Sequence, residues 1–162
     1  MTEEQAIRHF MLPRILPDGH CVALHQDHGV GILVHLSCDA QGPRLLGTCL
    51  FTPSEVSVLA PLLDHYPYFC PYAVLLASFY GSTEEAAIAR ARAQLEQARE
   101  SGTWDRQMRP VRNVLSRARL RLNRLGITIL SLIETGYTLM PAKAAQDTSP
   151  RAGTLRRPRR KR

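Results

Sequence analysis

The sequence predicts an α+β fold with an N-terminal antiparallel sheet, a helical middle and a C-terminal β-hairpin. Three observations support this order. Apolar residues recur with a period of two between residues 20 and 51, as in strands of a small sheet. From residue 52 to 124 they recur at helical spacing, and capping signals separate the helices. Two strand-like segments around Glu134-Thr135-Gly136 then form the hairpin.

Three strands are predicted in the N-terminal third, over residues 21–26, 32–38 and 44–51. The segments DHGVG and DAQGP between them are rich in turn-forming residues, which favours antiparallel pairing of neighbours. Ahead of the strands, residues 2–12 predict a short helix that ends before Pro13.

Two helices follow the sheet. Thr52 can cap the first, Pro53 fits its first turn, and Glu55 completes a capping box, so a helix should begin there and run to about residue 65. The second helix should follow Pro71 and stop at Gly81.

A further helix is predicted at about residues 83–101, where Ser82 and Glu85 resemble a second capping box. Its apolar stripe is narrow and rich in alanine, so we expect it to pack lightly. The two alternatives are packing against the body of the domain and packing against a second copy, which would give a homodimer.

The next helix, predicted from Pro110 to Arg124, carries an unusual charge pattern. Residues 106–124 contain seven arginines and no acidic residue. Residues 151–162 contain seven more basic residues and no acid, so they account for the whole net charge of +7. Natural solvated faces usually mix charges of both signs, so this segregation indicates a polyanionic partner rather than solubility alone.

The outward face of this helix has the chemistry of a DNA-reading surface. Arginine pairs bidentately with guanine and asparagine with adenine, so Arg112, Asn113 and Arg117 suit base edges. Ser116 can contact either base or phosphate. Leu120 is the one apolar residue at the centre of this face, and it would meet a thymine methyl group or a partner. The remaining arginines suit phosphate contacts, namely Arg109, Arg119, Arg121 and Arg124.

Four short motifs, in the right order, are similar to those of one family. They are LFTPSE at 50–55, LLASFYG at 75–81, VRNVLSRARLRL at 111–122 and the pair Gly136-Tyr137. Together they make residues 31–140 resemble the OmpR/PhoB-type winged helix-turn-helix DNA-binding domain. That resemblance implies a three-helix core plus one inserted helix, with the C-terminal hairpin as the wing.

The resemblance also assigns roles to individual residues. Positions on its recognition helix that face DNA match Arg109, Ser116, Arg117 and Arg119. On the wing, Ser131 matches a phosphate-contacting threonine and Tyr137 matches a tyrosine beside the sugar-phosphate backbone.

The sequence also departs from the family pattern. Arg112 and Val114 replace an acid and a histidine, so base preference should differ. Ile133 replaces the arginine that enters the minor groove, and Glu134 replaces a glycine. The inserted helix occupies the loop that contacts RNA polymerase in the family. RNA polymerase is therefore a possible partner, but the sequence does not decide whether this chain makes the family's contact with it.

These features divide the chain into an N-terminal extension (1–30), the DNA-binding domain (31–141) and a disordered basic tail (142–162). Thirty residues are too few for a receiver domain, so we expect a stand-alone transcriptional regulator of the cytoplasm, associated with the nucleoid. The alternative is a winged-helix protein-interaction or architectural module whose basic tail binds nucleic acid without sequence preference.

Other classes of function are less favoured. No nucleophile–base pair, phosphate-binding glycine loop or paired carboxylates are visible, so we expect neither an enzyme nor a cofactor. No apolar run approaches the ~20 residues of a membrane span. The four cysteines lack a CxxC pair, and a metal site near His20, Cys21, His25 and His28 is the weaker alternative to ordinary turn histidines.

Overall fold

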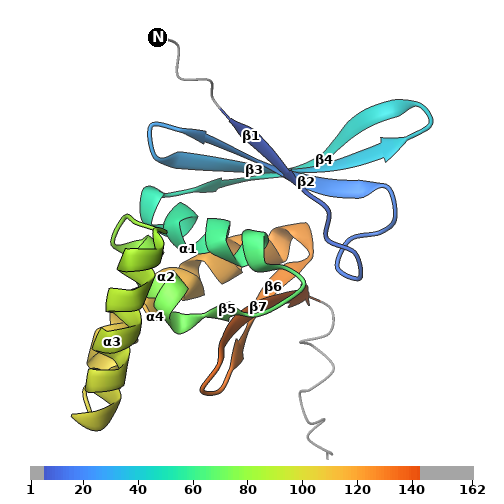
Figure 1. Ribbon diagram of the computed structural model, residues 1–162. Coiled ribbons are helices and arrows are strands. Elements are labelled where there is room, and N and C mark those ends of the chain that lie inside the picture. Colours follow the sequence, from blue (N-terminus) through green and yellow to red (C-terminus); the bar gives the residue numbers. More distant parts are fainter. Residues whose placement is uncertain (1–5, 143–162) are drawn as a thin grey trace, which may run out of the picture.

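The computed structural model describes residues 6–142 and is a mixed α+β fold (Figure 1). A four-stranded antiparallel sheet, in the order β1-β2-β3-β4, lies over the helices, and a smaller sheet β5-β7-β6 lies at their other end. The strands of the larger sheet are β1 (Ile7–Phe10), β2 (His20–Asp27), β3 (Val30–Asp39) and β4 (Gly42–Phe51). Those of the smaller sheet are β5 (Cys70–Pro71), β6 (Ile127–Leu132) and β7 (Gly136–Pro141).

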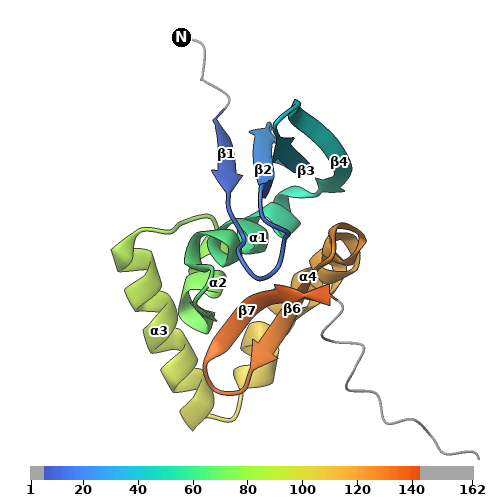
Figure 2. The same cartoon turned by 90° about the vertical axis from the view of Figure 1, so that its right-hand side faces the viewer.

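Four α-helices and one short 3-10 helix are found in the described part of the chain. They are α1 (Pro53–His65), α2 (Tyr72–Phe79), α3 (Glu85–Glu100), α4 (Trp104–Leu122) and η1 (Asn123–Leu125). Figure 2 shows α1 and α2 in the centre, with α3 along one side and α4 and the β6–β7 hairpin along the other. None of these helices is long and apolar enough to cross a membrane.

The predicted sheet is confirmed and also extends further toward the N-terminus. β2 pairs with β3, so residues 20–27 of the expected N-terminal extension belong to the sheet and supply the buried Val22 and Leu24. The short helix expected over residues 2–12 is wrong where the chain is described. Residues 7–10 pair with β2 instead, because sheet pairing satisfies their backbone groups and Arg8 reaches Asp64 on α1.

The sheet packs on α1 through one face only. A Cβ atom at Gly31 would lie 2.3 Å from Cγ2 of Val56, so only glycine allows β3 to approach the helix this closely. The predicted capping box of α1 is present: Thr52 Oγ1 accepts from the Glu55 amide, and the Glu55 carboxylate accepts from the Thr52 amide at 3.0 Å. This fixes where the sheet ends and the helices begin.

Two helix starts differ from the sequence prediction. α4 begins at Trp104, six residues before Pro110, because Trp104 and the fully buried Met108 anchor its first turns by tertiary packing. Packing therefore outweighs the loss of one backbone hydrogen bond at the proline. α3 is capped at Glu84 without a side-chain hydrogen bond, so the expected Ser82–Glu85 capping box does not form, and Ser82 accepts from the Glu84 amide instead.

The apolar stripe of α3 packs against the body of the domain. Ala91, Leu95 and Ala98 are each 5% exposed, and the first two belong to the main core. Of the two predicted alternatives, the structure shows the intramolecular one. The stripe is therefore not available as the surface of a homodimer. Of the predicted tail at 142–162, residues 143–162 lie outside the described residues.

Candidate nucleic-acid interface

The basic residues of α4 lie on the face that turns away from the core. The helix is amphipathic, and its buried stripe consists of Met108, Val111, Val114, Leu115, Ala118 and Leu122. Its nineteen residues correspond to a length of about 28 Å. Four predicted site residues are exposed on the opposite face, namely Arg109, Asn113, Ser116 and Arg117, and Arg124 is exposed just beyond its end.

Three predicted site residues on α4 are half-buried and have neighbours within the chain. Arg112 donates to Asp105 at 2.5 Å, which neutralises part of its charge. Arg121 donates to the Leu50 carbonyl at 2.6 Å and lies near Glu55. Arg119 has a buried Nε without a hydrogen-bond partner in the described part of the chain. Arg121 therefore has a structural role that the sequence did not reveal.

The two predicted hairpin residues lie opposite each other in the β6–β7 pair. Ser131 on β6 is the register partner of Tyr137 on β7. Ser131 is exposed, whereas Tyr137 is buried, so its ring is not presented to a partner as a free surface residue. Burial raises the pKa of Tyr137, with the nearby Tyr72 adding to the shift, and the phenol is neutral at physiological pH.

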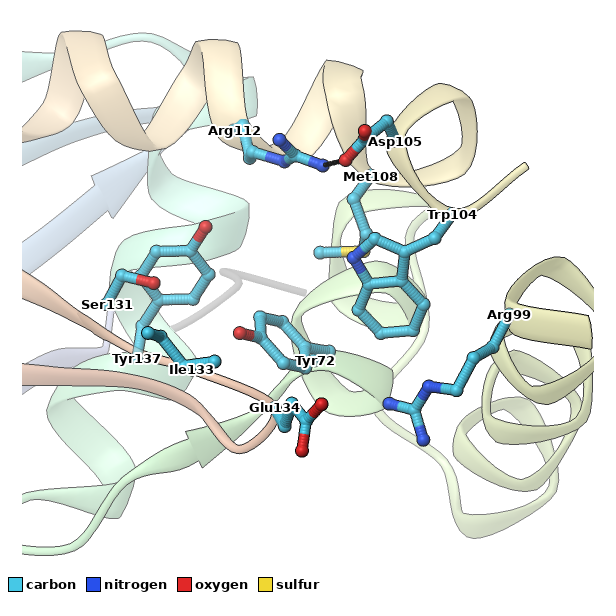
Figure 3. Close-up of a pocket in the computed structure, with 10 residues that line it drawn as sticks. All are labelled: Tyr72, Arg99, Trp104, Asp105, Met108, Arg112, Ser131, Ile133, Glu134 and Tyr137. Atoms are coloured by element: carbon cyan, nitrogen blue, oxygen red, sulfur yellow. Dashed lines mark hydrogen bonds and ion pairs between the residues drawn. The ribbon is translucent and has the colours of Figure 1, made fainter. Parts of the chain in front are cut away.

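A cavity of about 360 Å³ joins α4 to the hairpin (Figure 3). It brings Arg112 together with Ser131 and Tyr137, although these residues are far apart in the sequence. Ile133 and Glu134 at the hairpin tip form its rim, and Ile133 is 88% exposed. The hairpin and the start of α4 therefore form one continuous surface.

An aromatic cluster packs behind this surface. It was not predicted from the sequence. Tyr72 makes edge-on contacts with Trp104 at 5.1 Å and with Tyr137 at 5.6 Å between ring centroids. The Tyr72 hydroxyl donates to the Leu132 carbonyl at 3.0 Å, and Arg99 of α3 lies over the Trp104 ring. These contacts connect α2, α3 and α4 to the hairpin. The only feature of the sequence that could have indicated this cluster is Trp104, the single tryptophan.

The tip of the hairpin carries backbone strain. Glu134 has φ of +60°, a left-handed conformation that costs a residue with a side chain about 1–2 kcal/mol. Gly136, the first residue of β7, is needed for another reason: a Cβ there would lie 2.1 Å from the Cys70 carbonyl oxygen. Gly136 therefore lets β5 pair with β7 and fixes the hairpin against the start of α2.

The histidines and cysteines do not form a metal site in the part of the chain that is described. His20 Nδ1 and His35 Nε2 are 2.9 Å apart across β2 and β3, but residues 6–142 hold no group of three or more metal-ligating side chains. Burial, together with the nearby His20, lowers the pKa of His35, which favours the neutral form of the His35 ring at physiological pH.

The chain matches no family model, and no curated protein or solved structure is significantly similar to it.

Proposed function

We propose that this protein is a sequence-specific double-stranded DNA-binding transcriptional regulator. In this proposal α2 and α4 act as a helix-turn-helix, α4 enters the major groove, and the β6–β7 hairpin is the wing. The observation that carries it is the outer face of α4, where exposed Arg109, Asn113, Ser116 and Arg117 lie with no acidic residue between 106 and 124. The family resemblance and the order of elements support the same arrangement.

The exposed residues divide by the contacts they suit. Asn113, Ser116 and Arg117 lie at the middle of the outer face and suit base edges. Arg109 and Arg124 lie toward its two ends and suit phosphates. Arg112 and Ser131 line the cavity between the helix and the hairpin, where a sugar-phosphate backbone would pass. Arg119, half-buried on α4, suits a phosphate contact.

The hairpin favours backbone contact over minor-groove reading. The negative potential of a narrow minor groove attracts basic side chains, whereas Ile133 at the tip is apolar and Glu134 is acidic. The seven basic residues at 151–162 would add affinity without sequence preference. Specificity in this proposal therefore rests on α4.

The test is fluorescence anisotropy with full-length protein, duplexes selected from a random pool and unselected duplexes, across a salt series. Arg117→Ala should remove most of the preference for the selected sequence, a loss of roughly 10- to 100-fold for a bidentate base contact. Arg44→Ala is the matched control, because Arg44 is an exposed arginine on β4, outside the proposed recognition helix. It should leave the preference unchanged.

A second variant separates the helix from the tail. Replacing the seven basic residues of 151–162 by glutamine should weaken binding to all duplexes alike and reduce the salt dependence. If instead this variant abolishes binding, and no sequence is ever preferred, α4 does not read DNA. The protein-interaction or architectural module is then the better description.

A further inference from the structure

The outer face of the four-stranded sheet is apolar and uncovered in the described structure. Strand register places the residues of one face together, and the face opposite α1 holds Ile7, Val30, Ile32, Val34, Leu36, Leu45 and Leu50. Several are strongly exposed: Ile7 is 56%, Leu45 60% and Leu50 57% accessible. Figures 1 and 2 show no described element over this side of the sheet.

This face carries almost no charge. The strands contribute no lysine or arginine to it. Its polar members are Thr48, the histidines His9 and His25, and one carboxylate, Asp27, which lies at the hairpin end of β2. Antiparallel sheets with one solvated face normally alternate apolar and polar residues, so that the outer positions are polar. An apolar outer face of this extent indicates a contact surface rather than a solvated one.

The chain's own undescribed segments do not have the composition to cover this face. Residues 1–5 are MTEEQ, with two acids in five residues. Residues 143–162 contain eight basic residues and only one large apolar side chain, Leu155. Burying such charge against an uncharged apolar surface would be costly.

We propose that two copies of this chain associate through the outer faces of their β1–β4 sheets, forming a two-fold symmetric sandwich. A two-fold contact places the same surface on both partners, and a face whose single carboxylate, Asp27, lies at the end of a strand meets its copy with little charge repulsion. Sheets stack in this way at about 10 Å, with their apolar side chains interdigitated.

The size of the face fits a modest dimer. Strands of 4, 8, 10 and 10 residues form a face of roughly 500 Å² at usual strand spacings, so two copies would bury about 1,000 Å². That lies at the lower end for specific interfaces, so the dimer should dissociate on dilution through the micromolar range. The helix α4 lies on the opposite side of the sheet from this face, so the dimer would not cover it (Figure 2).

The test is sedimentation equilibrium of the full chain without DNA, which makes it independent of the proposed DNA binding. The weight-average mass of the wild-type protein should rise from 18.2 kDa toward twice that value as the protein concentration rises. Leu50→Arg places a charge on the β4 edge of the face, opposite Ile32, and should remain a monomer at all concentrations. Ile133→Arg, the same charge change at the hairpin tip, is the matched control and should dimerise normally.

A second variant distinguishes loss of the dimer contact from misfolding caused by Leu50→Arg. Thr48→Lys lies on the same face at an exposed position opposite Val34, and it should also prevent dimerisation while thermal unfolding stays cooperative. A wild-type chain that stays monomeric at high concentration overturns the proposal. So does a dimer that survives both substitutions, or one that only Ile133→Arg disrupts.

Discussion

Nε of Arg121 lies 3.3 Å from Oε2 of Glu55, whose side chain is 1% exposed, and this pair joins α4 to the first turn of α1. The same guanidinium donates to the Leu50 carbonyl at the end of β4. Glu55 also completes the capping box of α1 with Thr52. One arginine on the basic helix therefore connects the sheet, the first helix and the proposed recognition helix.

The first prediction is that Arg121→Ala destabilises the protein, whereas Arg117→Ala does not. Removing Arg121 leaves the buried Glu55 carboxylate without its cation, and because Arg121 is itself partly exposed we expect a loss of about 1–2 kcal/mol. Arg117 is exposed, so its replacement should change stability by less than about 0.5 kcal/mol. Urea unfolding measures both. Equal stability of the two variants would mean that the Arg121–Glu55 pair is not stabilising.

The second prediction concerns Asp105, the acidic partner of Arg112. Asp105→Asn should free Arg112 for a phosphate, so that DNA binding tightens at low salt and the slope of log K against log salt grows by about one unit. Asp39→Asn is the matched control. Asp39 accepts from the Gln41 amide in the β3–β4 turn, far from α4, and asparagine keeps that acceptor. Unchanged binding by Asp105→Asn would place Arg112 outside the interface.

The third prediction is that Gly136→Ala severely destabilises the hairpin. Its Cβ would lie 2.1 Å from the Cys70 carbonyl oxygen, a backbone atom that cannot move without breaking the β5–β7 pair. We expect a loss of at least about 3 kcal/mol in denaturant unfolding. Gly126→Ala is the control, because Gly126 also has positive φ but open space around its Cβ position. It should cost only about 1 kcal/mol of backbone strain.

The fourth prediction concerns thiol reactivity. Burial raises the pKa of Cys70 to about 12, with Asp64 adding to the shift, and Cys21 and Cys49 are also buried with raised pKa values. Because the thiolate is the reactive form, native protein at pH 8 should be alkylated at the exposed Cys38 first. Mass spectrometry after brief iodoacetamide treatment identifies the site. Cys38→Ser should remove the fast reaction, and fast labelling of Cys70 would contradict its burial.

The same thiol should make stability depend on pH. The pKa of the Cys70 thiol is about 12 in the folded state, against an ordinary value of 9.0 that we take for the unfolded chain. Between pH 9 and pH 12 the unfolded state therefore loses the thiol proton while the folded state keeps it. The contribution of Cys70 is fully present below pH 9 and is lost as pH rises toward 12. In Cys70→Ala the fall in unfolding free energy between these values should be smaller than in wild type.

The sequence predicted those elements whose signals are local. The strands at 20–51, the Thr52–Glu55 capping box and the hairpin after Gly126 each depend on neighbouring residues, and all appear in the structure. The start of α4 could not be predicted in this way. Pro110 is a strong local signal for a helix start, and only the packing of Trp104 against Tyr72 moves that start to residue 104.

The candidate site shows the same division. Helical periodicity placed Asn113, Ser116 and Arg117 on the outer face, where the structure has them. Periodicity cannot show which arginines have partners elsewhere in the chain, so the contacts of Arg121 with residues some 70 positions away were missed. The burial of Tyr137 was missed for the same reason, since Tyr72 covers it only in the folded state.

The position of the single tryptophan has a practical consequence. Trp104 lies between the Arg99 guanidinium and the Tyr72 ring, beside the cavity that joins α4 to the hairpin. Its emission therefore arises from one place, next to the surface where we propose that DNA binds. The unlabelled protein carries its own optical reporter: quenching on titration with duplex would locate binding at the hairpin, and unchanged emission would direct attention to other surfaces.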